Sequence, residues 1–338
     1  MLQISKKVKV WHDVTRDIFE NEIQQSGQPA ILKGYVNHWP IVNIAKQGNT
    51  HLAHYLNDNY VGGKVKYARL KAKFNGLFTY NEAFNGFNFK REVNEFASFI
   101  KELLDAPEQQ ERDTLALQSA MLSEHFPSYA SEHVFDLFDK EVEPRIWIGS
   151  NAVVAAHYDD AENIACNVAG RRRFTLFPPE QINNLYLGPI DFTPAGAPIS
   201  LVDFSAPDFN KYPRFKLALQ HALVAELEPG DALYIPSLWW HHVQSLANFN
   251  ILINYWSGGA IGGNEKPSPL DLMLMSMVTI RDLPQHQKNA WRDYFDYYIF
   301  SDQTDKYEHI PKRKRSILGQ LSEKHVKDIT SWLLSQLK

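Results

Sequence analysis

The most constraining feature of this sequence is a series of short runs rich in β-branched and aromatic residues between Pro144 and Trp256. Turn-forming Gly, Pro, Asn and Asp residues separate the runs, which read RIWIGS, NAVVAAHYD, NIACNVAG, RRFTLFPP, HALVAELEPGD, ALYIPS, HHVQSL and NILINYW. Runs of this length and composition are typical of β-strands, and no helical period intervenes between them. The segment therefore predicts an antiparallel barrel or jelly roll rather than alternating βαβ units.

The flanking regions have a different character. Before about residue 140 the chain mixes the amphipathic segment TRDIFENEIQQSG (Thr15–Gly27) with a short apolar run, PAILKG (Pro29–Gly34), which predicts an α+β region. From Pro267 onward the pattern is helical, without strand signals. We expect a mainly β protein with α additions, in which a double-stranded β-helix spans about residues 144–256. The predicted domains are 1–263, which contains this barrel core, and a helical region at 264–338.

The C-terminal helices carry an excess of apolar side chains. Met and Leu lie on nearly all sides of the segment Leu270–Met277, which is explained either by a dimer interface or by a helix buried inside its own domain. The next segment adds a cluster of aromatic residues, namely Trp291, Tyr294, Phe295, Tyr297 and Tyr298. Because this is more apolar surface than one helical face hides, we predict a homodimer formed through these helices.

Composition excludes several classes of protein. With 338 residues, 44% of them hydrophobic and 22% charged, the chain is typical of a folded globular protein. The single cysteine, Cys166, excludes an intramolecular disulfide and a cysteine-based zinc site. The sequence lacks a secretory signal and any run long enough to span a membrane, so we expect a cytoplasmic protein without a membrane partner. The net charge of −4 argues against a general nucleic-acid binder.

A histidine and an aspartate stand two residues apart at the end of one predicted strand. Of the 13 histidines, only His157 begins an H-x-D triplet, His157-Tyr158-Asp159. Alternate residues of a strand share a face, so both side chains can bind one metal ion. The triplet alone is a weak signal, because it also arises by chance. A third ligand is offered by His241 or His242, which lie in another predicted strand, and strands far apart in sequence can be neighbours in a jelly roll.

Two histidines and one carboxylate form the facial triad of non-haem Fe(II) oxygenases, which leaves metal positions open for a co-substrate and O₂. A keto acid bound at the open positions can supply the extra electrons that O₂ activation requires. A keto diacid also needs a cation for its far carboxylate, and an arginine suits this role. One of Arg171, Arg172 and Arg173 could provide it.

Longer motifs, in the same order, resemble the jumonji-C/cupin-like 2-oxoglutarate oxygenases. They are HYDDAENIACNVAGRRRFTLFPPEQINNLYLGP, SLVDFSAPDFNKYPRF, EPGDALYIPSLWWHHVQS and ILINYW, preceded by QPAILKGYVNHWP (Gln28–Pro40). Within that family they are most similar to the asparaginyl hydroxylase that inhibits hypoxia-inducible factor. The likeness covers roughly residues 25–260, and residues 48–111 show no firm likeness. Motifs that occur in a fixed order are far more specific than any one alone.

The resemblance implies roles for individual residues. The metal ligands would be His157, Asp159 and His241, with Fe(II) as the metal, 2-oxoglutarate as co-substrate and O₂ as oxidant. Arg172 falls at the family's basic position in GRRRFTLFPP and would bind the far carboxylate. Three further residues match positions that line the co-substrate pocket, namely Asn163, Asn254 and Trp256.

Two positions depart from the family pattern. Val154 stands where the asparaginyl hydroxylase has a threonine, and Ala116 stands where it has a tyrosine, so two hydroxyl contacts to the keto acid are missing. The expected activity is hydroxylation of a substrate, with a protein side chain favoured over a small molecule, and release of succinate and CO₂. The alternatives are a non-catalytic metal-binding module and a triad enzyme that acts on a small molecule without 2-oxoglutarate.

Overall fold

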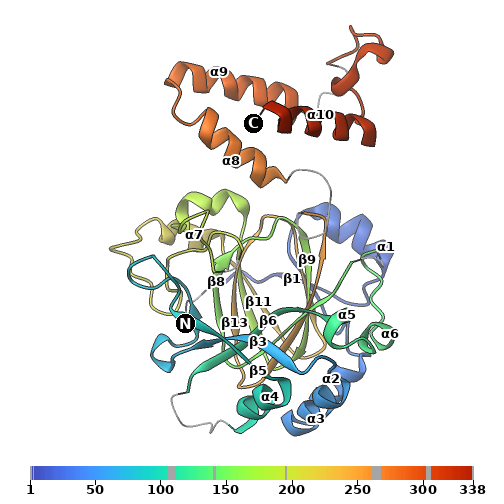
Figure 1. The fold of residues 1–338 in the computed structure, drawn as a ribbon, viewed down its shortest axis with the longest axis vertical. Helices are drawn as coiled ribbons and strands as arrows, with labels where there is room; N and C mark the ends of the chain where they lie inside the picture. Colours follow the sequence, from blue (N-terminus) through green and yellow to red (C-terminus); the bar gives the residue numbers. More distant parts are fainter. Residues whose placement is uncertain are drawn as a thin grey trace. The chain divides into compact units, whose positions relative to one another are not determined.

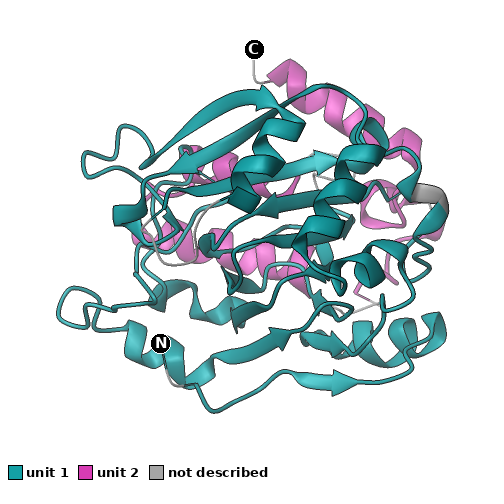
Figure 2. Cartoon of the chain, turned by 90° about the horizontal axis from the view of Figure 1, so that it is seen from below, with its two compact units in different colours: residues 1–262 teal, residues 263–338 magenta. Residues whose placement is uncertain are grey.

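The computed structural model describes residues 2, 4–105, 112–139, 142–194, 196–259, 268–301 and 306–336. The chain divides into two compact units, Met1–Gly262 and Gly263–Lys338, which Figure 2 shows in different colours. The boundary expected between residues 263 and 264 lies outside the described residues.

Two sheets form the first unit (Figure 1). Within the described residues the larger sheet has nine strands, in the order β1 (Lys9–Trp11), β2 (Ala30–Leu32), β12 (Ala232–Ile235), β9 (Glu162–Ala169), β14 (Asn250–Ser257), β7 (Arg145–Gly149), β6 (Thr114–Met121), β3 (Lys64–Leu70) and β5 (Phe89–Glu95). The smaller sheet has five described strands, in the order β11 (Leu223–Leu227), β10 (Arg172–Phe177), β13 (Trp240–Ser245), β8 (Val153–His157) and β4 (Leu77–Phe78). Pairing is antiparallel except between β1 and β2 and between β4 and β8.

The mainly β fold with a cupin-type jelly roll is confirmed. Each of the short runs expected to be a strand between Pro144 and Trp256 is one, from β7 to β14. The expectation that no helix intervenes is wrong, because α7 (Phe215–His221) lies between β10 and β11. Its buried residues Phe215 and Ala218 are three apart, a short helical period that the turn-rich segment around it obscures.

The larger sheet buries both of its faces. Its outer face packs against α2 (Pro40–Ala45), α3 (Asn49–Asn59) and α4 (Phe96–Asp105) in the largest apolar cluster of the protein. Its inner face packs against the smaller sheet through residues such as Ala165, Phe174, Leu176, Leu233 and Leu252. Isoleucines 146 and 148 of β7 belong to the outer cluster, and Trp147 between them belongs to the inner one, as strand alternation requires.

Short helices complete the first unit: α1 (Arg16–Ile18), α5 (Leu122–His125) and α6 (Tyr129–Glu132). The second unit consists of helices α8 (Pro269–Thr279), α9 (Gln285–Phe295) and α10 (Glu323–Gln336). None of its described residues is buried, and Leu272 and Met273 of α8 are 49% and 41% exposed. The explanation of α8 as a helix buried inside its own domain is therefore wrong. No helix in the described ranges is both long and apolar enough to cross a bilayer.

Candidate metal centre

The pairing of β8 with β13 brings the predicted metal ligands together. His157 and His241 are direct partners in the antiparallel register, and their ring centroids lie 4.2 Å apart. Asp159 follows the end of β8, and its Oδ2 lies 3.6 Å from His241 Nε2. One ligand atom from each of the three residues lies within 4.8 Å of the others, so a single metal ion can contact all three. The structure thus brings two histidines and one carboxylate together in one cluster.

Backbone carbonyls orient both imidazole rings. His157 Nδ1 lies 2.9 Å from the carbonyl oxygen of Ala155, and His241 Nδ1 lies 3.0 Å from that of Trp239. A carbonyl only accepts, so each Nδ1 carries a proton, and Nε2 is the ring nitrogen that remains to bind a metal. Burial and the neighbouring His157 hold the pKa of His241 below its usual value. His241 is therefore neutral at physiological pH, which is the form that binds metals.

A chain of side chains positions the carboxylate. Asp159 Oδ2 accepts hydrogen bonds from Asn163 Nδ2 at 3.2 Å and from Trp256 Nε1 at 3.0 Å. Asn254 Nδ2 in turn donates to Asn163 Oδ1 at 2.7 Å. Hydrogen bonds of this kind fix the direction of a metal ligand and raise its affinity. Asn163, Asn254 and Trp256, which were expected beside the co-substrate, therefore form a hydrogen-bond network that orients Asp159.

His242 points to the other side of its strand. It is buried and stacks on Phe204, with ring centroids 4.4 Å apart and an interplanar angle of 12°. Burial lowers its pKa to about 3, so it too is neutral. The alternation of β13 places it outside the cluster formed by His157, Asp159 and His241.

A cavity of 650 Å³ opens beside the ligands. Its polar lining includes the three ligands together with Asn163, Asn254 and Trp256. Its apolar lining comes from the inner faces of both sheets, namely Trp147, Val154, Phe174, Val243 and Leu252. A space of this size holds a small organic molecule and a substrate side chain, and its apolar walls limit the access of water.

Arg172 is a buried cation without a counter-ion among the described residues. Only 7% of it is exposed, and on β10 it shares a face with Phe174 and Leu176 of the inner core. Burial lowers its pKa to about 10, so it remains charged at neutral pH. Its Nε has no hydrogen-bond partner among the described residues, and none of their carboxylates forms an ion pair with it. Arg172 does not itself line the cavity, whereas Phe174, two residues along the same face, does.

The neighbouring arginines differ from Arg172. Arg171 forms an ion pair with Glu228 at 2.9 Å, and Arg173 forms one with Glu226 at 3.4 Å. Both pairs lie on the side of β10 that faces away from the inner core.

Sequence reasoning missed several lining residues. Trp147 lines the cavity, and its indole Nε1 is buried without a partner in the described part of the chain. Arg91, Gln118 and Arg145 line the cavity as well. The alternation in RIWIG could have indicated Arg145 and Trp147, because they share the face opposite the two isoleucines.

Comparison with known proteins agrees with this geometry. Residues 15–257 match the model of the family described as the cupin-like domain. JmjC domain-containing protein F of Dictyostelium discoideum is 29% identical over 280 residues, which are 71% of this chain and 59% of that protein. HSPB1-associated protein 1 of Homo sapiens is 36% identical over 116 residues, or 34% of this chain and 23% of that protein. The tRNA wybutosine-synthesizing protein 5 of Danio rerio is 26% identical over 277 residues, or 74% of this chain and 75% of that protein.

The chain covers less than two thirds of the length of the first two of these relatives. The family model nevertheless spans every described strand except β1, together with all three residues of the cluster. None of these comparisons tests the more specific likeness to the asparaginyl hydroxylase. The match over most of the first unit shows that this chain belongs to the cupin-like, JmjC-type domain family.

Proposed function

We propose that this protein is an Fe(II)- and 2-oxoglutarate-dependent dioxygenase that hydroxylates a protein side chain. In oxygenases, a triad of two histidines and one carboxylate that leaves metal positions open is typical of iron. His157, Asp159 and His241 would hold it. When bound, Fe(II) and 2-oxoglutarate would supply the electrons that reduce O₂. The keto acid would be oxidised to succinate and CO₂, and the substrate would be hydroxylated.

The burial of Arg172 without a counter-ion in the described part of the chain is the observation that supports the co-substrate best. An unpaired charge in an apolar interior is costly, so a ligand that brings an anion is strongly favoured there. Leu176 of β10 pairs with His241, and Arg172 lies four residues further along the strand, roughly 13 Å away. A five-carbon diacid and the long arginine side chain together span such a distance. Its far carboxylate would form a bidentate pair with the guanidinium.

The two hydroxyl contacts of the family pattern are missing in this sequence. Val154 lines the cavity without a hydroxyl, and Ala116 lies on β6 with only 7% of its surface exposed. Each lost hydrogen bond costs about 1 kcal/mol of binding. Trp147 Nε1 is a buried donor that lines the same cavity, and we propose that it donates to the keto acid in their place.

The formation of succinate tests this function. Fe(II)-loaded protein should form succinate from 2-oxoglutarate in air, slowly even without substrate. Arg172→Gln should raise the half-saturating 2-oxoglutarate concentration by about tenfold or more, because a charged hydrogen-bonded pair is lost. Arg171→Gln is the matched control, since Arg171 pairs with Glu228 and should leave the curve unchanged.

Identical curves for both variants would contradict the role of Arg172. Metal binding with neither succinate formation nor O₂ consumption would instead favour the non-catalytic module. O₂ consumption without a keto acid would favour the small-molecule enzyme. One of the similar proteins is named for tRNA wybutosine synthesis. An RNA base is therefore the alternative substrate to a protein side chain.

A further inference from the structure

The inner face of the larger sheet continues past the metal centre and carries cations. Arg145 pairs with Asn254 of β14, so it lies on the inner face beside the ligand-lined cavity. Further along the sheet, Ala68 of β3 pairs with both Ala116 of β6 and Arg91 of β5. Arg91 therefore shares the face of Ala68, and so do Lys66 and Lys64, which alternate with it along β3.

These cations line a second cavity, which adjoins the cavity at the candidate metal centre. It has a volume of 410 Å³ and is lined by Lys64, Lys66, Arg91 and Arg145, with Glu124 as the one acidic residue among its described lining residues. Arg91 and Arg145, together with Gln118 and Ser119, line both cavities. The two spaces thus adjoin at a shared wall that contains two cations. We call Lys64, Lys66, Arg91 and Arg145 the cationic track.

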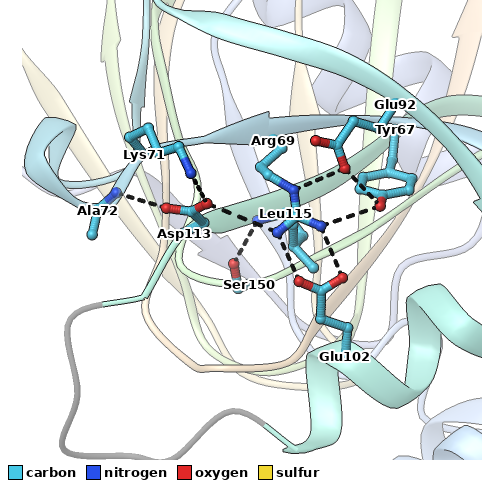
Figure 3. A network of polar contacts seen from close by, with 9 residues as sticks. All are labelled: Tyr67, Arg69, Lys71, Ala72, Glu92, Glu102, Asp113, Leu115 and Ser150. Atoms are coloured by element: carbon cyan, nitrogen blue, oxygen red, sulfur yellow. Dashed lines mark hydrogen bonds and ion pairs between the residues drawn. The ribbon is translucent and has the colours of Figure 1, made fainter.

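Cations on the opposite face, on β3 and directly after it, form ion pairs with carboxylates. Arg69 forms ion pairs with Glu92 at 2.8 Å and Glu102 at 2.7 Å, and Lys71 forms one with Asp113 at 2.9 Å (Figure 3). In contrast, no residue of the cationic track forms an ion pair with a described residue, and Arg145 makes only 3.4 Å contacts with Ser119. Cations on one face of this part of the sheet therefore have carboxylate partners, whereas those on the other face form no ion pair with any described residue.

Cations that lack an ion pair within the described residues, beside the candidate metal centre, fit an anionic substrate. The net charge of −4 disfavours a polyanion such as RNA, whose binding depends on a broad positive field and many phosphate contacts. A short peptide with a few carboxylates requires only a local patch. Lys64 and Lys66 stand two residues apart on a strand, about 7 Å, which is also the spacing of alternate side chains in an extended peptide.

We infer that the substrate is an acidic peptide segment that lies along the cationic track, with carboxylates two residues apart bound by Lys64 and Lys66. Arg91 and Arg145 would bind a further carboxylate close to the residue that enters the cavity. This inference rests on the proposed function, because it takes the metal centre as the place of reaction. It concerns binding, however, and binding can be measured without iron or turnover.

Selection from a display library of short random peptides tests the inference. Peptides recovered on the wild-type protein should be enriched in Asp and Glu at positions two apart. Binding of these peptides, labelled and measured by fluorescence anisotropy, should weaken at least about tenfold in the Lys64→Glu/Lys66→Glu double variant, because attraction becomes repulsion. It should also weaken as salt is raised.

Lys90→Glu is the control for a charge reversal on the opposite face of the same sheet. Lys90 lies next to Arg91 on β5, but it pairs with Arg69 and so faces the other side of the sheet. It should leave peptide affinity within about twofold of wild type. Both altered lysines are exposed, so equal melting temperatures should show that the variants fold.

Three results would overturn the inference. They are the absence of acidic enrichment, equal weakening by Lys90→Glu, and stronger binding of a single-stranded oligoribonucleotide than of any recovered peptide. Succinate formation without peptide reports on the proposed function separately, so failure of one assay is distinguishable from failure of the other.

Discussion

His241 and His242 are adjacent residues with opposite environments, because successive side chains of a strand point to opposite faces. His241 faces the metal centre, and His242 stacks on Phe204. We therefore expect His241→Ala to abolish tight Fe(II) binding and His242→Ala to preserve it, as equilibrium dialysis with metal analysis can measure. Loss of metal from His242→Ala alone would reverse the assignment of the third ligand.

The hydrogen bonds that orient Asp159 lead to a second prediction, which concerns Trp256. Trp256→Phe removes the Nε1 donor, which lies 3.0 Å from Asp159 Oδ2, while it keeps an aromatic ring in place. Metal affinity should fall about 10- to 100-fold, because the carboxylate loses part of its orientation. Competition with a chelator measures this change. Trp291→Phe, at a half-exposed tryptophan in α9, is the control and should bind metal like wild type.

The sequence predicted the cluster of His157, Asp159 and His241 better than its surroundings. The H-x-D triplet and the strand WWHHVQSL indicated all three ligands, because strand alternation is a local rule. Choosing His241 over His242 and Arg172 over its neighbours needed the family resemblance. Trp147 and Arg145 were missed: alternation in RIWIG puts them on one face of a strand, but which face meets the cavity depends on the pairing of β7 with β14.

At the scale of elements, β3 joins the metal-binding barrel to its extension. Arg69 of β3 contacts Glu92 of β5 and Glu102 of α4, and so ties an edge strand and a helix to the sheet (Figure 3). Its side chain is 19% exposed, whereas both carboxylates are more exposed, so solvent weakens the pairs. Arg69→Gln should lower the free energy of unfolding by about 1 kcal/mol, measured by urea denaturation.

Lys71→Gln provides the comparison for this prediction. Its pair with Asp113 is a single contact from a side chain that is 67% exposed, so its loss should cost clearly less than the loss of Arg69. Equal unfolding midpoints for the two variants would contradict the role of Arg69 as an anchor.

The strands between Pro144 and Trp256 could be predicted because each has a clear local pattern bounded by turn residues. The extension formed by β3, β5 and β6 could not. These strands lie largely in the part of the sequence without firm family likeness, and their partners are distant in the chain. Pairing at such separations follows from the packing of α4 and the barrel, which single-sequence patterns do not contain.

For the whole molecule, the C-terminal unit lacks a core of its own within a single chain. No described residue of α8, α9 or α10 is buried, although these helices carry many large apolar side chains. Exposed apolar surface on this scale marks an interaction site. We propose that a second copy of the chain covers it, which would make the protein a homodimer.

Sedimentation measures this assembly directly. The full-length protein should sediment as a dimer, and truncation after Gly263 should give monomers or insoluble protein. Leu272→Glu/Met275→Glu, which places two charges three residues apart on α8, should give monomers because burial of carboxylates is costly. Lys314→Glu, on the exposed polar side of the same unit, is the control. A wild-type protein that sediments as a monomer would contradict the proposal.

The central claim for the whole molecule is that one site binds Fe(II) and 2-oxoglutarate together. The most direct measurement is the visible absorption of the Fe(II)-loaded protein, titrated with 2-oxoglutarate in the absence of oxygen. We predict a charge-transfer band that saturates with 2-oxoglutarate in the wild type, requires higher concentrations in Arg172→Gln and is absent in His157→Ala. A wild-type protein that binds Fe(II) tightly but develops no such band would contradict the account.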